Sequence, residues 1–306
     1  MSTRSLFTQA GALALCTATL FAPQALAEAE VAPTLTGIRA GHQPATGTSV
    51  ARDRLVFDFD GPLPAHRSAR WVSEPRYRTP DVSEVGLVPI SGNAYLEVTF
   101  HSVLAHEEAT GLNTYGATSR AFDLPNIMQV VNNDDFEHSV SFLAGVSAKK
   151  PFRMFTLTSP SRLVIDLDAD LQTVPASAFF QDLPAYQAGR PDDVRSVTRQ
   201  VVPPATAKGA LQRLFAGPTA VEQQNGLRFV SSGAKGFSNL SITAGVAKVR
   251  LTGGCNSGGS TFTIAKLIVP TLRQFSTVSA VKIYDPNGTT ENPTGPGDSL
   301  PECLEP

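Results

Sequence analysis

The 306-residue sequence is poor in cysteine, with three in all and no Cys-x-x-Cys pair. Structural zinc sites need closely spaced cysteine and histidine ligands, so the sequence predicts no such site. Positive charge is also not in excess, because 25 lysines and arginines face 27 aspartates and glutamates. Nucleic-acid binding proteins cluster basic residues against phosphates, and this charge balance argues against that class.

Long apolar runs are missing after the first thirty residues, so no later segment reaches the roughly 20 apolar residues that a bilayer span needs. The early run, from about residue 10 to 22, follows Arg4 and precedes Ala25-Leu26-Ala27. This pattern predicts a secretory signal peptide over residues 1–27. A retained anchor would need a longer run, and a lipoprotein would need Cys16 after a small residue rather than Leu15. We expect an exported protein, extracellular or associated with the cell wall, with no transmembrane segment after cleavage.

Two cysteines, Cys255 and Cys303, remain after the predicted cleavage. Disulfides persist in exported proteins, so we expect these two to be bridged, with two free thiols as the alternative. In the chain-entropy model, closing a loop of this length stabilises the fold by about 4 kcal/mol.

Residues 34–169 form a series of short runs rich in β-branched and aromatic residues. Turn-forming pairs separate the runs, and no amphipathic helical pattern lies between them. The clearest runs are residues 55–60, 95–103, 127–131, 138–143, 152–157 and 163–167. The sequence therefore predicts an N-terminal all-β, sandwich-like domain over residues 34–169.

Residues 176–300 follow a different pattern, after a short predicted linker at residues 174–178. Strand-like runs at residues 194–202, 246–251 and 278–284 alternate with two helical patterns. The first helix is expected to start at an N-cap, Thr206, and to end before Gly217. The second is expected over residues 261–275, with a kink or break at Pro270. This alternation predicts a C-terminal α/β (α+β) domain.

The run Asp58-Phe59-Asp60-Gly61 resembles the first motif of haloacid-dehalogenase-type phosphatases. Asp58 would then be the nucleophile and Asp60 a general acid, with Mg²⁺ offsetting the phosphate charge. Pro62 follows Gly61, and the sequence does not predict the helix and the parallel sheet that such a phosphatase would have after this motif. The competing interpretation is a strand with Phe57 and Phe59 buried and both aspartates solvated.

Other clusters of reactive side chains have ordinary structural explanations, so we predict no catalytic residue, metal site or cofactor. His101, His106, Glu107 and Glu108 lack the His-Glu-x-x-His spacing of zinc helices. The pairs at residues 134–135 and 192–193 stand beside turn-forming residues, where aspartate often caps the backbone. The glycines of residues 253–259 lack the lysine of a phosphate loop.

One stretch mixes aromatic and positively charged side chains, which suits stacking on sugar rings and pairing with carboxylates. Its members are glycan-binding candidates, although a lone tryptophan is more often part of a core. They are Arg70, Trp71, Arg76, Tyr77 and Arg78.

The first domain resembles the AMIN-like domain of exported bacterial proteins. The resemblance rests on residues 53–64, 135–138, 151–153 and 159–166, together with Gly145. It implies a β-rich module, because AMIN modules are β-rich and are associated with cell-wall targeting of larger envelope proteins.

The second domain resembles the GerMN (sporulation and spore-germination) domain. Residues 197–199, 206–214, 217–219, 268–275 and 278–285 carry this resemblance, and the ending at residues 297–306 fits members with a paired cysteine. The family's α/β fold is akin to ring-building modules of envelope assemblies and supplies no known catalytic residues.

Together these features predict a non-catalytic envelope protein. The AMIN-like domain would engage the wall or a partner, and the GerMN domain would make protein contacts. The expected partners are peptidoglycan or another envelope polymer, and envelope proteins. A metal-dependent phosphatase using Asp58 and Asp60 is the enzymatic alternative. The third hypothesis is an assembly factor that binds proteins only. Such a protein would fail to sediment with purified peptidoglycan.

Overall fold

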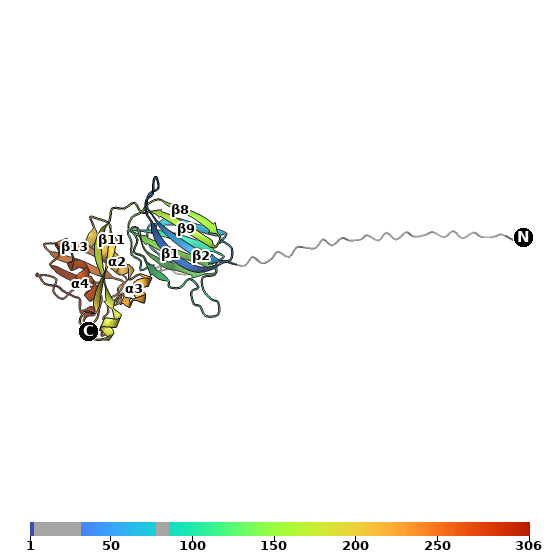
Figure 1. Cartoon of the computed structure of the whole chain (residues 1–306). Coiled ribbons are helices and arrows are strands. Elements are labelled where there is room, and N and C mark those ends of the chain that lie inside the picture. Colours follow the sequence, from blue (N-terminus) through green and yellow to red (C-terminus); the bar gives the residue numbers. More distant parts are fainter. Residues whose placement is uncertain (3–31, 78–85) are drawn as a thin grey trace. The chain divides into compact units, whose positions relative to one another are not determined.

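The computed structural model describes residues 1–2, 32–77 and 86–306 (Figure 1). Apart from its first two residues, the predicted signal peptide lies outside the described residues, and so does Arg78. Residues Ala32–Pro306 form one compact unit. Below, the N-terminal half means residues 32–169 and the C-terminal half residues 170–306. Among the described residues, no helix has both the length and the apolar character needed to cross a bilayer.

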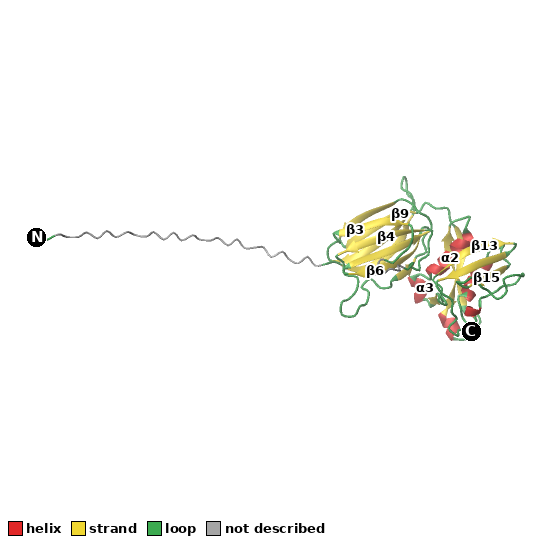
Figure 2. Ribbon diagram, turned by 180° about the vertical axis from the view of Figure 1, so that it is seen from behind, coloured by secondary structure: helices red, strands yellow, loops and turns green. Residues whose placement is uncertain are grey.

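The N-terminal half consists of two antiparallel sheets (Figure 2). Their strand orders are β1-β2-β9-β8 and β3-β4-β7-β6-β5. The strands are β1 (Thr34–Gln43), β2 (Arg52–Asp60), β3 (His66–Val72), β4 (Ala94–His101), β5 (Ser119–Ala121), β6 (Ile127–Phe136), β7 (Ser139–Val146), β8 (Phe152–Thr158) and β9 (Ser161–Asp168).

Phenylalanines from both sheets meet in the core of this half. The Phe57 ring on β2 lies 5.1 Å from the Phe100 ring on β4 and 5.4 Å from the Phe142 ring on β7, measured between centroids. Successive side chains of a strand point to opposite faces, so Phe57 faces the second sheet while Asp58 faces outward. Two sheets packed face to face in this way form a sandwich. The predicted all-β, sandwich-like domain is confirmed.

The C-terminal half combines two further sheets with helices. One sheet has the order β11-β10-β12 and the other β13-β14-β15. The strands are β10 (Val174–Asp182), β11 (Val194–Val201), β12 (Leu227–Arg228), β13 (Gly236–Thr243), β14 (Val246–Thr252) and β15 (Ala280–Tyr284). The helices are α1 (Leu183–Gln187), α2 (Thr206–Ala216), α3 (Ala220–Gln224) and α4 (Ala265–Arg273), with a 3₁₀ turn at Glu302–Leu304.

Helix α4 forms the crossover between two parallel strands, because β14 precedes it and pairs in parallel with β15, which follows it. Helices α2 and α4 contribute their apolar faces to one buried cluster with these strands. Its fully buried members include Leu211, Leu214, Val249, Leu267 and Ile283. The predicted α/β character of this half is confirmed.

Three sequence-based details differ from the structure. Residues 174–178 are not a linker but the start of β10, where Ala176 and Ala178 alternate inward with Phe180. Small side chains and Pro175 concealed this alternation. Thr206 is the first residue of α2 rather than its N-cap, and the cap position is held by Ala205 without a side-chain hydrogen bond. Helix α4 is shorter than expected and continues through Pro270 to Arg273, so the proline does not divide it.

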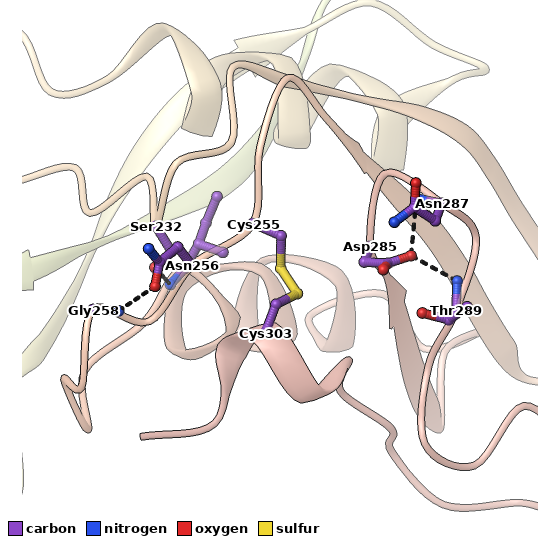
Figure 3. The surroundings of a disulfide bond; sticks show 9 residues. Ser232, Cys255, Asn256, Gly258, Asp285, Asn287, Thr289 and Cys303 are labelled. Carbon is purple, nitrogen blue, oxygen red and sulfur yellow. Dashed lines mark hydrogen bonds between the residues drawn. A yellow bond between two sulfur atoms is a disulfide. The ribbon is translucent and has the colours of Figure 1, made fainter.

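A disulfide joins Cys255 to Cys303, as predicted (Figure 3). Cys255 lies in the loop after β14, Cys303 lies in the 3₁₀ turn, and their Cα atoms are 5.6 Å apart. The Ser257 amide also donates to the Cys303 carbonyl oxygen at 2.7 Å. The bridge therefore fastens the end of the chain to the loop that leads into α4.

Candidate binding groove

Helix α2 carries polar side chains that reach the N-terminal half. The Gln212 amide donates to the Gly92 carbonyl oxygen at 3.1 Å and to Asn93 Oδ1 at 2.9 Å. The Lys208 ammonium donates to the same Asn93 oxygen at 2.9 Å. Residues four apart share one face of a helix, so Lys208 and Gln212 together bind the loop that precedes β4.

The next residue, Arg213, is a buried cation with only 1% of its surface exposed. Its Nη1 donates to the Phe122 carbonyl oxygen at 3.1 Å, and its Nη2 donates to the Leu124 carbonyl oxygen at 2.6 Å. Burial lowers the pKa of Arg213 to about 10, against the partial opposing effect of Asp123. At neutral pH the guanidinium is still protonated, so a full positive charge connects α2 to the loop before β6.

Asp53 on β2 holds that same loop from the other side. Its carboxylate is fully buried and accepts hydrogen bonds from the backbone amides of Asn126 at 2.7 Å and Ile127 at 2.9 Å. The ring of His42 lies 2.8 Å from its second oxygen. The carbonyl groups that receive Arg213 are therefore carried by a segment whose amides are bound to the sandwich core.

Two adjoining hollows, each of about 710 Å³, lie beside this contact. Both are lined by Tyr77, Pro89, Phe215 and Lys235, so they form two ends of one cleft, which we call the interdomain groove. Clefts between domains are a preferred location of ligand sites. The lining also includes Leu87, Ser119, Ala121 and Gln129 from the N-terminal half, and Lys208, Gln223, Arg228, Phe229 and Phe237 from the C-terminal half.

The charges around the interdomain groove have one sign. Lys208, Arg228 and Lys235 line it, whereas its described lining contains no aspartate or glutamate. The whole chain has a formal net charge of −2, so the excess of cations in the groove does not reflect the overall composition. A cleft lined by charges of one sign attracts ligands of the opposite sign.

The amide side chains of the groove are engaged within the protein. Gln129 accepts a hydrogen bond from the Ser91 amide at 2.8 Å and donates to the Ser119 hydroxyl at 2.9 Å. Gln223 donates to the Pro218 carbonyl oxygen at 2.8 Å. These two side-chain amides therefore hold the walls of the groove in place through bonds within the protein.

The cations of the groove differ in how much of their bonding capacity is used. Arg228 donates through Nη1 to the carbonyl oxygens of Gln223 at 2.6 Å and Leu227 at 2.8 Å. The Lys235 ammonium has no hydrogen bond or ion pair to any residue that the structure describes. A Cβ atom at Gly253 would come within 2.6 Å of the Lys235 side chain, so the glycine leaves room for its stem. Lys235 is the cation most available to a ligand.

The glycan candidates that the structure describes have the following contacts. Arg70 pairs with Glu97 at 2.7 Å, and Arg76 pairs with Glu74. Trp71 packs against the sandwich core and meets the Phe152 ring edge-on at 6.0 Å. Tyr77 alone of the described candidates lines the interdomain groove.

The aspartates of the phosphatase alternative lie on an antiparallel strand. Arg39 donates two hydrogen bonds to Asp58, at 2.9 and 3.0 Å, on the outer face of the first sheet. Strand β2 lies between β1 and β9, both antiparallel to it, and β3 follows rather than a helix. Asp60 is exposed at the strand end. This arrangement does not support the phosphatase alternative.

The remaining polar clusters form separate pairs. His101 lies 2.8 Å from the Ser139 hydroxyl, and His106 lies 3.0 Å from Asp135. Lys266 binds Asp193 at 3.0 Å. Within the described part of the chain, no three histidine, cysteine or acidic side chains are grouped so as to hold a metal ion.

Apart from Tyr77, sequence reasoning missed the residues that build the groove. The helical pattern singled out the apolar face of α2, with Leu211 and Leu214, and left Lys208, Gln212 and Arg213 as apparent surface positions. Their spacing is that of any solvated helix face. Arg228 and Lys235 likewise stand in segments without a motif, so no signal in the sequence distinguished them.

Family models match both halves of the chain. The AMIN-like domain model matches residues 33–169, and the sporulation and spore germination model matches residues 182–290. No curated protein and no solved structure matches the chain significantly. The two family matches agree in order with the all-β sandwich and the α/β half. The chain therefore consists of an AMIN-like domain followed by a domain of the sporulation and spore germination family.

Proposed function

We propose that this protein is an exported, non-catalytic component of the bacterial cell envelope. In this proposal the AMIN-like half engages the wall or a wall-bound partner, and the C-terminal half makes protein contacts. Membership of the AMIN-like family supports an envelope location, and a disulfide is typical of proteins outside the reducing cytosol.

The observation that carries the proposal is the groove formed jointly by both halves. Arg213, Gln212 and Lys208 bind the α/β half to loops of the sandwich, so residues from both families line one cleft. Its described lining offers cations and apolar rings but no carboxylate, histidine or cysteine. Such a lining is suited to holding a ligand of complementary charge and shape.

Sedimentation with isolated cell walls tests the first part of this proposal. The purified, oxidised protein is mixed with walls and centrifuged, and a soluble protein of similar size and charge serves as the control. We expect this protein to pellet with the walls and the control to remain in solution. Equal recovery of both in the supernatant would remove wall binding and leave an assembly factor that contacts proteins only.

A phosphoester assay tests the second part. The protein and its Asp58→Asn variant are incubated with a generic phosphoester and Mg²⁺. We expect no turnover from either, because Asp58 is occupied by Arg39. Turnover that disappears in the variant would show that the protein is an enzyme.

A further inference from the structure

We infer that the interdomain groove binds an extended, acidic segment of a partner protein, with apolar side chains among its acidic ones. The inference deepens the proposed function, since it names the kind of partner that the two halves contact together. It commits to a peptide rather than a glycan.

The size of the groove indicates a chain-like ligand. Sites for single small molecules usually enclose about 300–1,000 Å³. Each of the two hollows alone has about 710 Å³, and they are continuous through Tyr77, Pro89, Phe215 and Lys235. One small molecule would occupy one hollow, whereas a peptide of several residues occupies both.

The charge of the groove indicates an acidic ligand. Lys235 is exposed and unpaired among the described residues. Arg228 is also exposed, and its Nη2 and Nε make no hydrogen bond to the described residues. Lys208 lines the second hollow, and its ammonium donates one hydrogen bond to Asn93. Cations spaced along a cleft whose described lining has no carboxylate complement the side chains of aspartate and glutamate and accelerate the encounter with them.

The apolar side chains of the groove favour a ligand that carries apolar side chains of its own, as a peptide does. Three aromatic rings are grouped there, with Phe215 lying 5.5 Å from Phe229 and 5.4 Å from Phe237 between centroids. Leu87 and Tyr77, which line the groove from the N-terminal half, are 57% and 39% exposed. Apolar side chains of a peptide would bury this surface. Neutral sugars instead carry no negative charge to pair with Arg228 and Lys235.

The strand edges beside the groove indicate an extended conformation. Strand β5 is the last strand of its sheet, and β12 is the last strand of another. Ser119 and Ala121 of β5 and Arg228 of β12 line the groove. Thr219 bridges to Ala121, which leaves the Ser119 end of β5 without a neighbour on that side among the described residues. Edge strands present unpaired backbone groups, and extended peptides bind by adding to them.

A selection from random peptides tests this inference without knowledge of the partner. The purified full chain, with its disulfide intact, is immobilised and used to select binders from a displayed library of short random peptides. We expect the enriched peptides to carry an excess of aspartate and glutamate together with leucine, valine or phenylalanine. Enrichment without an acidic excess would overturn the inference.

Charge reversal then locates the binding. Affinity for a selected peptide is measured for the wild type, for the double variant Arg228→Glu/Lys235→Glu, and for Lys248→Glu as the matched control. Lys248 is exposed on β14 and does not line the groove. We expect the double variant to lose at least about tenfold in affinity and the control to keep the wild-type value at the same ionic strength. Equal affinities of all three would overturn the inference.

The same variants separate this inference from the proposed function. All three residues are exposed, so the variants should unfold at the wild-type temperature, which is checked first. If wall sedimentation persists in the double variant while peptide binding is lost, wall engagement lies elsewhere on the protein and both conclusions stand. If the double variant loses wall sedimentation and no acidic peptide is selected, the groove binds an anionic wall polymer and the peptide inference is wrong.

Discussion

At the scale of single residues, Arg213 determines how firmly the two halves are joined. Its guanidinium satisfies the carbonyl oxygens of Phe122 and Leu124 in a buried setting. In Arg213→Met a side chain of similar length remains, but both carbonyl groups lose their donor. Each unsatisfied buried group costs about 1–3 kcal/mol, so we expect the free energy of unfolding to fall by about 2–4 kcal/mol. Urea denaturation of the full chain measures this loss.

Arg273→Met is the matched control for that variant. Arg273 also lies on a helix of the C-terminal half, but it is 47% exposed and pairs with Asp298 at 2.8 Å. Exposed ion pairs contribute about 0–1 kcal/mol, so the control should unfold close to the wild type. Equal losses in the two variants would mean that Arg213 has no special role between the halves.

Asp166 on β9 makes stability depend on pH. Arg54 donates to it at 2.7 and 2.9 Å, and this hydrogen bonding lowers its pKa despite the opposing effect of burial. A carboxyl with a lowered folded-state pKa contributes stability above its unfolded pKa, about 4, and loses that contribution as pH falls through the folded value. Asp166→Asn should therefore be less stable than the wild type by about 1.5–3 kcal/mol at pH 7, the usual worth of charged hydrogen bonds.

The pH profile separates this account from simple packing damage. Urea denaturation at neutral pH and near pH 2 should show the difference between Asp166→Asn and the wild type shrinking as the wild-type carboxyl is protonated. A difference of constant size across that range would show that the lowered pKa of Asp166 does not contribute to stability.

These buried charges also mark a limit of prediction from sequence. Asp166 sits in the run of residues 163–167, which is rich in β-branched residues, so its strand was predictable, but Arg54 lies 112 positions away. The register that pairs Arg54 with Asp166 comes from the antiparallel pairing of β2 with β9. The burial of Arg213 could not be predicted at all, because a buried arginine and a solvated one look alike in a helical sequence pattern.

At the scale of elements, the disulfide is the contact whose removal should be most costly in the C-terminal half. It joins residues 48 positions apart and fastens the 3₁₀ turn to the loop between β14 and α4. Restricting an unfolded loop of this length stabilises a fold by about 4 kcal/mol in the chain-entropy model. The double variant Cys255→Ser/Cys303→Ser should unfold at lower urea concentration than the oxidised wild type, by up to this amount.

Reduction provides the control for that measurement. Dithiothreitol should lower the stability of the wild type and leave the double variant unchanged, because only the wild type has a bond to lose. A wild type whose unfolding is insensitive to the reductant, with two freely alkylatable thiols in the native protein, would rule out the bridge.

The elements most readable from sequence were those with a strong alternation. Strand β2 was predictable because Leu55, Phe57 and Phe59 alternate with Asp58 and Asp60, and the structure buries the first set. Strand β10 was missed because its inward residues before Phe180 are alanines, which give little hydrophobic contrast. Helix α3 was missed although Thr219 and Glu222 form a capping box, because only five residues follow the cap.

At the scale of the whole molecule, the interdomain groove could not be predicted from either half alone. The buried apolar residues of the two halves form separate clusters. The sequence predicted a β-rich half and an α/β half. It did not reveal which loops of the sandwich face α2. Tyr77 lies in the AMIN-like half and Lys235 in the C-terminal half. The two residues line one cleft only because α2 contacts the loops of the sandwich.

The separate clusters predict that each half folds alone. Fragments covering residues 28–171 and 173–306 contain the complete sandwich and all strands from β10 onward. Each should unfold cooperatively in urea, because each keeps its own core. The second fragment should also lose stability on reduction, since it retains the bridge between Cys255 and Cys303. An unfolded fragment beside a folded full chain would show that the halves depend on one another.

Arg213 makes that test more specific. In the fragment of residues 173–306 its guanidinium would be exposed, because its partners Phe122 and Leu124 are absent. Arg213→Met should then change the stability of the isolated fragment by less than about 0.5 kcal/mol, the usual range for surface substitutions. The same substitution should cost about 2–4 kcal/mol in the full chain. Comparing the same substitution in the fragment and in the full chain follows the logic of a double-mutant cycle. It assigns the loss to the contact between the halves, because the C-terminal core is common to both measurements. A large loss in the fragment as well would place the role of Arg213 inside the α/β half, and the groove would lose the contact that fixes its walls.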